Sequence, residues 1–490
     1  METIILVSFA IYTLLLFAVT RLTSRKADND AFFRGSRKSP WLAVAYGMLG
    51  ASLSGVTFMS VPGGVYHGQF TYLPLVLGYV VGYAVIALLL LPTYYRLNLT
   101  SIYTYLERRF GTASEGTGAL FFILSRLLGS ALRMYLVVFV LYEFVFKAWG
   151  VPFWVPAVAF IALILLYTFR GGIKTIVWTD TLQTTFLLLA AILTLAAMLR
   201  QMGVGYGTLM RQAATEGLTT VWVTDVAHPR FWVKQLLAGA FITITMTGLD
   251  QDMMQKNLSC RTLRDAQKNV LTSSLLFVVV NVIFLSLGAA LICYARFSGL
   301  PLPLDAAGSV AGDKIFPTIA FSLNTFTAVV FVLGLVAAGY SSADGTLAAL
   351  TTTFCYDFLH FDRRQGMDER RQTRLRQWAH VGFAALYLLV IMAFRPFHND
   401  SLINTLFDVA GLTYGPLLGL YAFGLFTRWQ VRDRLTPLVA VAAPAICYVL
   451  KANSFDWFSY HFGFEILLLN GLLTFLGLVL IRDRRKDNPT

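Results

Sequence analysis

Several ionisable residues of this chain stand inside long apolar stretches, where charge is unusual. An aspartate or arginine at the centre of a membrane-spanning helix costs about 2.5 to 3.5 kcal/mol, so each needs a partner or a function. Arg126 shares a helix face with Arg133, and we expect its long side chain to reach the headgroups. The candidates for an intramembrane role are Arg133, Asp180, Asp250, Asp252, Asp344 and Asp408.

The segment 337–345 is rich in small and hydroxyl-bearing residues. In a helix, Ser341 and Ser342 lie on or beside the face of Ala338, so two hydroxyls point at one spot on a facing helix. Hydroxyls and freed carbonyls are hard oxygen ligands that suit an alkali cation, whereas magnesium and calcium call for a denser set of carboxylates. The segment therefore predicts a site for a monovalent cation.

Motifs for other chemistries are missing from the sequence. It has no HExxH pair, no P-loop and no GxSxG, and its six histidines are dispersed, so we expect neither an enzyme nor a bound cofactor. Four cysteines without a CxxC pair indicate neither a disulfide framework nor a zinc site. The net charge of +13 comes from basic residues in short segments between apolar runs, so nucleic acid is not an expected partner.

The elements that must position these residues are membrane-spanning helices. Of the 490 residues, 57% are hydrophobic and only 13% are charged, against about a quarter in soluble chains. A crossing helix needs roughly 20 apolar residues. This rule predicts an all-α integral membrane protein in a lipid bilayer with about thirteen spans, near 2–21, 41–66, 72–95, 115–147, 152–170, 176–200, 233–256, 269–295, 318–358, 377–394, 402–427, 435–451 and 464–481.

Lysine and arginine are distributed unequally between alternate connections, which orients the spans. One set of connections, near 21–38, 96–109, 170–174, 256–268, 363–376, 428–434 and 482–486, carries most of them, Lys256 included. We therefore expect a multi-pass protein of the cell (inner) membrane with its amino terminus outside and its carboxyl terminus in the cytoplasm.

Two spans carry signs of a broken helix. The second is dense in glycine, serine and threonine over 47–57, and the seventh has Asp250 and Asp252 after three threonines. They lie five spans apart and so run in opposite directions, as two inverted five-helix repeats require. We expect repeats at 41–200 and 233–427, with peripheral segments at 1–40 and 435–490. Small residues could instead serve only close helix packing.

Four stretches together resemble the sodium/solute symporter family, which has a LeuT-type inverted-repeat fold and includes sodium-glucose, proline and sialic-acid symporters. They are GASLSGVTFMS, GGIKTIVWTDTLQ, QKNLSCRTLRDAQK and AAGYSSADGTLAALTTTFCYDF. The resemblance implies a sodium site made of the carbonyls of Gly50 and Leu53 with Ala338, Ser341 and Ser342.

The resemblance also implies a possible second cation site at Asp180, Ser341 and Asp344. Members with an additional sodium have two serines where this chain has Asp344 and Gly345. Asp344 could supply a stronger ligand or share a proton with Asp180, because two close carboxylates rarely both ionise without a cation between them.

For the solute, resemblance to the sialic-acid symporters implies hydroxyls at Ser52, Ser54 and Thr57 and a carboxylate bound by Arg133. Asp250 and Gln251, at the second break, are further candidates for the solute site. If Arg133 only neutralises Asp250 or Asp252, a neutral sugar fits instead.

The expected function is sodium-coupled secondary active import of such a solute by alternating access. We expect a monomer to suffice, with sodium as the coupling ion. The alternatives are a proton-coupled carrier that uses Asp180 and Asp344, and a transporter-like sensor.

Overall fold

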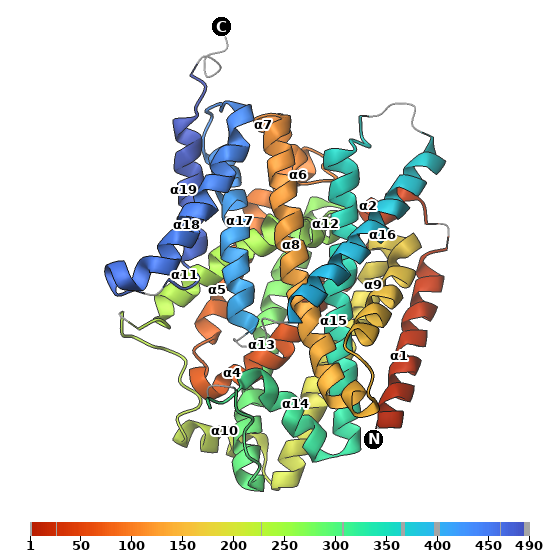
Figure 1. Cartoon of the computed structure of the whole chain (residues 1–490), viewed down its shortest axis with the longest axis vertical. Helices are drawn as coiled ribbons and strands as arrows, with labels where there is room; N and C mark the ends of the chain where they lie inside the picture. Colours follow the sequence, from red (N-terminus) through yellow and green to blue (C-terminus); the bar gives the residue numbers. More distant parts are fainter. Residues whose placement is uncertain are drawn as a thin grey trace.

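The computed structural model describes residues 2–25, 27–226, 228–305, 308–363, 368–395, 402–460 and 462–484, and this part of the chain is almost entirely helical (Figure 1). The crossing helices are α1 (Glu2–Thr23), α3 and α4 (Trp41–Ser52, Gly55–Gly68), α5 and α6 (Leu73–Val85, Leu91–Arg96), α8 (Thr112–Leu141), α9 (Trp154–Met202), α11 and α12 (Trp232–Thr243, Gln251–Leu258), α13 (Leu263–Ser298), α15 (Thr325–Thr353), α16 (Glu369–Ala393), α17 (Leu402–Phe426), α18 (Thr436–Phe458) and α19 (Ile466–Leu480). Short helices are α2 (Asn29–Arg34), α7 (Thr104–Arg109), α10 (Tyr206–Thr215) and α14 (Gly312–Leu323).

The number of crossings agrees with the sequence. In the described residues nine helices are long and apolar enough to span a membrane, and the two bent pairs bring the number to eleven. The shorter apolar helix α19 adds one. Helix α9 counts twice, because its 49 residues would extend about 73 Å, more than twice the hydrocarbon thickness. Thirteen crossings result.

Helix α9 turns back at Gly172, where φ is 49° and ψ is −139°. This left-handed backbone conformation favours glycine. A Cβ there would also come within 2.5 Å of the Phe32 carbonyl oxygen, so α2 occupies the space beside the turn.

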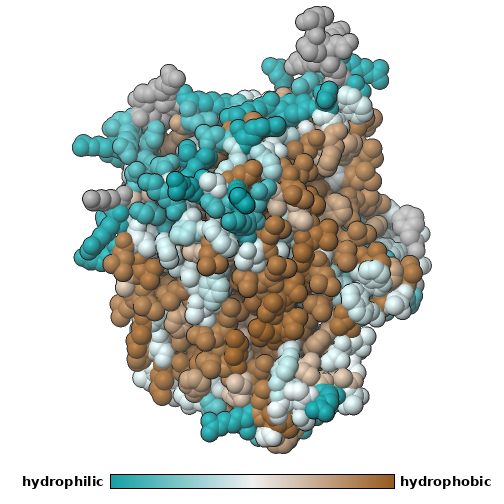
Figure 2. Space-filling view, turned by 180° about the vertical axis from the view of Figure 1, so that it is seen from behind, coloured by the Kyte–Doolittle hydropathy of each residue, from teal (hydrophilic) through white to brown (hydrophobic). Residues whose placement is uncertain are grey.

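On the face shown in Figure 2, a belt of hydrophobic residues lies between two hydrophilic ends. The exposed large apolar residues include Leu14, Leu88, Leu166, Leu275 and Leu389, from five different crossings. Helix α1 begins at one end and the last helix leads to the other (Figure 1), as an odd number of crossings requires. The belt is the surface that lipid covers.

The predicted span 318–358 is wrong at its start. The chain is extended at Asn324, with φ −170° and ψ 168°, and this divides the apolar run into α14 and α15. The Asn324 side chain accepts a hydrogen bond of 2.9 Å from the Thr327 amide and thereby caps α15. Composition hid the break because both helices are apolar.

Both predicted helix breaks are present. Helices α3 and α4 meet at 63°, and the helix beginning at Trp232 meets α12 at 68°. The breaks lie five crossings apart, in agreement with an inverted repeat. Helices α8, α9 and α15 pack together beside them and form the wall against which both breaks rest.

Candidate functional site

The first break leaves backbone carbonyls free at the predicted sodium site. The last hydrogen bond of α3 runs from the Leu53 amide to the Leu49 carbonyl. Leu53 is non-helical, with φ −85° and ψ 76°, so the carbonyls from Gly50 onward lie beyond the regular ladder. Such carbonyls are available to a cation.

Gly50 lets two other helices approach this break. A Cβ at Gly50 would lie 2.3 Å from the Thr184 hydroxyl oxygen and 3.1 Å from that of Ser341. The Thr184 hydroxyl accepts a hydrogen bond of 3.0 Å from the Gly50 amide. The absence of a side chain therefore brings the end of α3 against α9 and α15.

Helix α15 presents Ala338, Ser341 and Ser342, all buried. The carbonyl of Ser342 accepts hydrogen bonds from the hydroxyls of Ser130, at 3.1 Å, and Thr346, at 2.8 Å. The Ser342 hydroxyl itself, 1% exposed, has no hydrogen-bond partner in the described part of the chain. A buried hydroxyl without a partner costs free energy, so this oxygen stands out among the buried polar groups of α15.

The second predicted cation site already contains a positive charge of the protein, the ammonium group of Lys256. The hydroxyl of Ser341 donates to Asp180 Oδ1 at 2.8 Å, and Lys256 Nζ lies 2.9 Å from Asp180 Oδ2. The placement of Lys256 in a basic cytoplasmic connection is wrong, since this side chain is 1% exposed. Its position four residues after Asp252 on α12 turns it inward, where Nζ lies 3.4 Å from Asp252 Oδ1.

Asp344 does not join this ion pair. Its Oδ2 accepts a hydrogen bond of 2.9 Å from the Tyr167 hydroxyl, and its Oδ1 accepts the Gly345 amide at 2.6 Å. The structure therefore brings Asp180 and Ser341 together, whereas the carboxylate of Asp344 accepts its hydrogen bond from another residue of α9, Tyr167.

Arg126, expected at the headgroups, is buried. It pairs with Asp252, and its Nη1 lies 3.6 Å from Asp250 Oδ2. Asp250 also accepts a hydrogen bond of 2.6 Å from the Tyr414 hydroxyl. The expectation for Arg126 was wrong because the second break brings two carboxylates within reach, and pairing with them replaces the need to reach water. Arg126 thus supplies the neutralising charge that one hypothesis gave to Arg133.

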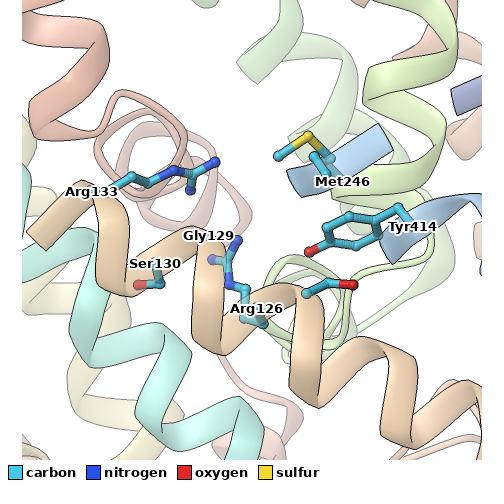
Figure 3. Close-up of a pocket in the computed structure, with 8 residues that line it drawn as sticks. Arg126, Gly129, Ser130, Arg133, Met246 and Tyr414 are labelled. Atoms are coloured by element: carbon cyan, nitrogen blue, oxygen red, sulfur yellow. The ribbon is translucent and has the colours of Figure 1, made fainter. Parts of the chain in front are cut away.

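A narrow cavity lies between α8 and the helices opposite. Its lining consists of Ser125, Arg126, Gly129, Ser130, Arg133, Met246, Ala410 and Tyr414. Figure 3 shows the two arginines reaching from α8 toward the space that Met246 and Tyr414 border from the other side. Among the described residues Arg133 makes no ion pair, and its Nε is buried without a hydrogen-bond partner.

Of the other predicted solute residues, Asp250 contacts the lining residues Arg126 and Tyr414. Ser52, Ser54, Thr57 and Gln251 are not part of the lining. The Ser54 hydroxyl accepts the Thr57 amide at 3.5 Å and caps α4. The Ser52 hydroxyl interacts with Tyr83. Gln251 accepts a hydrogen bond of 2.9 Å from the Ile102 amide and donates one of 2.8 Å to the Thr100 carbonyl, which ties α12 to the turn before α7.

Several residues of these sites were absent from the predicted set, among them Arg126, Thr184, Met246, Lys256 and Tyr414. Lys256 could have been found, because it stands four residues after Asp252 at the end of an apolar span. For Met246 and Tyr414 the sequence carries no signal beyond ordinary core residues.

Comparison with known proteins identifies the family and the fold. The model of the sodium:solute symporter family matches residues 32–428. The sodium/sialic acid symporter NanT of Aliivibrio fischeri is 26% identical over 462 residues, which cover 92% of this chain and 88% of NanT. SiaT of Proteus mirabilis, also a sodium/sialic acid symporter, is 24% identical over 96% of this chain and 94% of its own. A substrate-bound, outward-open structure of a Na+-coupled sialic acid symporter has the same fold, with a TM-score of 0.82 over 97% of both chains at 21% identity.

Proposed function

The chain belongs to the sodium:solute symporter family, and from that premise we propose that it imports a small solute that carries a carboxylate. A sialic acid or another sugar acid is the first candidate. The observation that carries the proposal is the state of Arg133, whose guanidinium borders the cavity without an ion pair among the described residues. A buried arginine needs an anion, and its planar fork matches a carboxylate.

The neutral-sugar alternative loses its main support. It requires Arg133 to neutralise Asp250 or Asp252, but Arg126 already pairs with both. Arg133 therefore adds uncompensated positive charge to the cavity. The names of the two bacterial relatives favour the same solute class.

The proposed sodium site joins the broken helix to α15. Its ligands are the carbonyls of Gly50, Leu53 and Ala338 and the hydroxyls of Ser341 and Ser342. Support comes from the close approach at Gly50 and from the unpartnered Ser342 hydroxyl. Sodium entering from outside would hold α3 against α15, and rocking of one repeat against the other would then open the site to the cytoplasm.

The cavity as it stands is small for a sugar acid. The cavity volume is about 10 Å³, room for roughly one water molecule, whereas pockets that enclose drug-sized ligands hold about 300 to 1,000 Å³. A sialic acid and a smaller carboxylate therefore both require the cavity to widen, and the sialic acid requires more widening. Both solute sizes belong in the test.

The test is the thermal stability of the purified protein in sodium and in potassium with sialic acid, glucuronate, lactate, glucose and proline. We expect stabilisation by a carboxylate solute only in sodium, because a ligand that binds the folded state alone raises its stability. Arg133→Gln should abolish the solute-dependent part, since hydrogen bonds to charged groups contribute about 1.5 to 3 kcal/mol. Arg211→Gln, at an exposed position of α10, is the matched control.

Stabilisation by glucose with full retention in Arg133→Gln would overturn the carboxylate proposal. The proton-driven alternative is not adopted, because the family is sodium-coupled, and the sensor alternative has no observation in its favour.

A further inference from the structure

We propose that the ammonium group of Lys256 is a built-in cation that takes the place of a second sodium at Asp180, so that the protein binds one sodium in each transport cycle. The inference rests on the proposed sodium site at Ser342. It assigns Lys256 as a positioning residue and sets the ratio of ion to solute.

The ammonium lies where a cation would have to bind. Lys256 Nζ is 2.9 Å from Asp180 Oδ2, and both side chains are 1% exposed. Asp180 Oδ1 already accepts the Ser341 hydroxyl at 2.8 Å. Both carboxylate oxygens are therefore engaged, and a sodium ion at this carboxylate would meet a like charge in a medium of low dielectric constant.

The backbone of α15 is shaped to admit this ammonium. A Cβ at Gly345 would lie 2.8 Å from Lys256 Nζ and 2.3 Å from Asp252 Oδ1. Any side chain at position 345 would collide with the ion pair. Gly345 thus provides the space in which Lys256 reaches from α12, across α15, to Asp180 on α9.

Lys256 also acts on the proposed sodium site through Asp180. Because the hydroxyl proton of Ser341 donates to Asp180, the lone pairs of that hydroxyl remain available to a cation. The ammonium keeps Asp180 ionised and in place, and Asp180 orients Ser341. Lys256 is in turn held by Asp252, 3.4 Å away.

The inference predicts the electrical behaviour of transport. One sodium with one monovalent carboxylate carries no net charge, so uptake should produce no current and should not respond to membrane potential. Two sodium ions with the same solute would carry one positive charge inward.

The deciding experiment counts radioactive sodium bound at equilibrium to the purified full-length protein, without solute. We expect one sodium per wild-type molecule with a hyperbolic isotherm, and at least tenfold weaker binding in Ser342→Ala. Lys256→Gln should gain a second sodium at the vacated carboxylate, and Lys256→Arg should keep one. If Lys256→Gln does not fold, the second variant combines Lys256→Gln with Asp252→Asn. It removes the Lys256–Asp252 pair, one positive and one negative charge together, and should also bind two sodium ions.

The outcomes separate this inference from the proposed symport. Two sodium ions on the wild type, or only one on the folded Lys256→Gln proteins, would overturn the built-in cation and leave sodium symport intact. No sodium on the wild type would overturn the proposed sodium site and, with it, the ratio of one sodium per cycle. A sodium gained only on removal of Lys256 would then support the replacement of a cation at Asp180 alone.

Discussion

Both broken helices leave backbone groups without helical hydrogen bonds, but the side chains around the two breaks differ in charge. At the break between α3 and α4, where we propose that sodium binds, the available groups are free carbonyls and the buried hydroxyl of Ser342. At the break before α12, Asp250 and Asp252 meet Arg126, and Asp252 also meets Lys256. In our proposal the first break binds an ion from solution, whereas charges of the protein itself neutralise one another at the second.

The difference follows from residue size. Gly50 admits the hydroxyls of Thr184 and Ser341 to the first break, so small neutral groups fill it. At the second break Asp250 caps the first turn of α12 by accepting the Met253 amide at 3.2 Å. A carboxylate is stable at a helix amino terminus, and once buried it needs a cation from a neighbouring helix.

The largest expected effect comes from removing an ion pair at the break before α12. Arg126→Gln leaves Asp250 and Asp252 buried with Lys256 as the remaining cation. Removal of one partner of a buried pair costs about 3 to 5 kcal/mol, so we expect a large loss of unfolding free energy in detergent, measured by denaturant titration. Arg126→Gln with Asp252→Asn should recover much of it. Equal stability of the single and double variants would show that the pair does not close this break.

An effect of intermediate size tests the proposed sodium site at the break between α3 and α4. Ser342→Ala should weaken sodium binding roughly 10- to 100-fold, the equivalent of a contact to a charged group, while unfolding in potassium stays unchanged. The measurement is the sodium dependence of thermal stability. Ser298→Ala, on the exposed end of α13, is the control. A normal sodium response in Ser342→Ala would remove this residue from the site.

The smallest effect tests the close approach at the first break. Gly50→Ala puts a methyl group 2.3 Å from the Thr184 hydroxyl oxygen, and overpacking of this kind costs about 1 to 3 kcal/mol. Thr184→Ala in the same chain should relieve most of the cost, as thermal unfolding would report. Gly64→Ala has open space around it and should be neutral or slightly stabilising. Equal losses at both glycines would mean that helix propensity, and not crowding, is responsible.

The sequence predicted the fold in most respects. Spans of about 20 apolar residues and the spacing of the two breaks gave thirteen crossings and an inverted repeat, because the bilayer imposes both length and composition. It failed at Asn324, where two apolar helices follow one another without a polar loop.

The candidate sites were predicted unevenly. Residues whose role depends on local backbone, such as Gly50 and Leu53, lie where the broken helix was expected. Those whose role depends on a partner were misjudged: Arg126 and Lys256 were assigned to the membrane surface, and both are buried among aspartates.

The sequence by itself therefore determined that this chain crosses a membrane many times, that two helices break and that small hydroxyl residues gather on one helix. Only the tertiary structure decided which charges meet. Whether an apolar run enters the membrane depends on its free energy of transfer from water to lipid, which is a property of that segment alone. The energy of a buried charge depends on groups within a few ångströms, and those of Asp180 and Lys256 come from helices far apart in the chain.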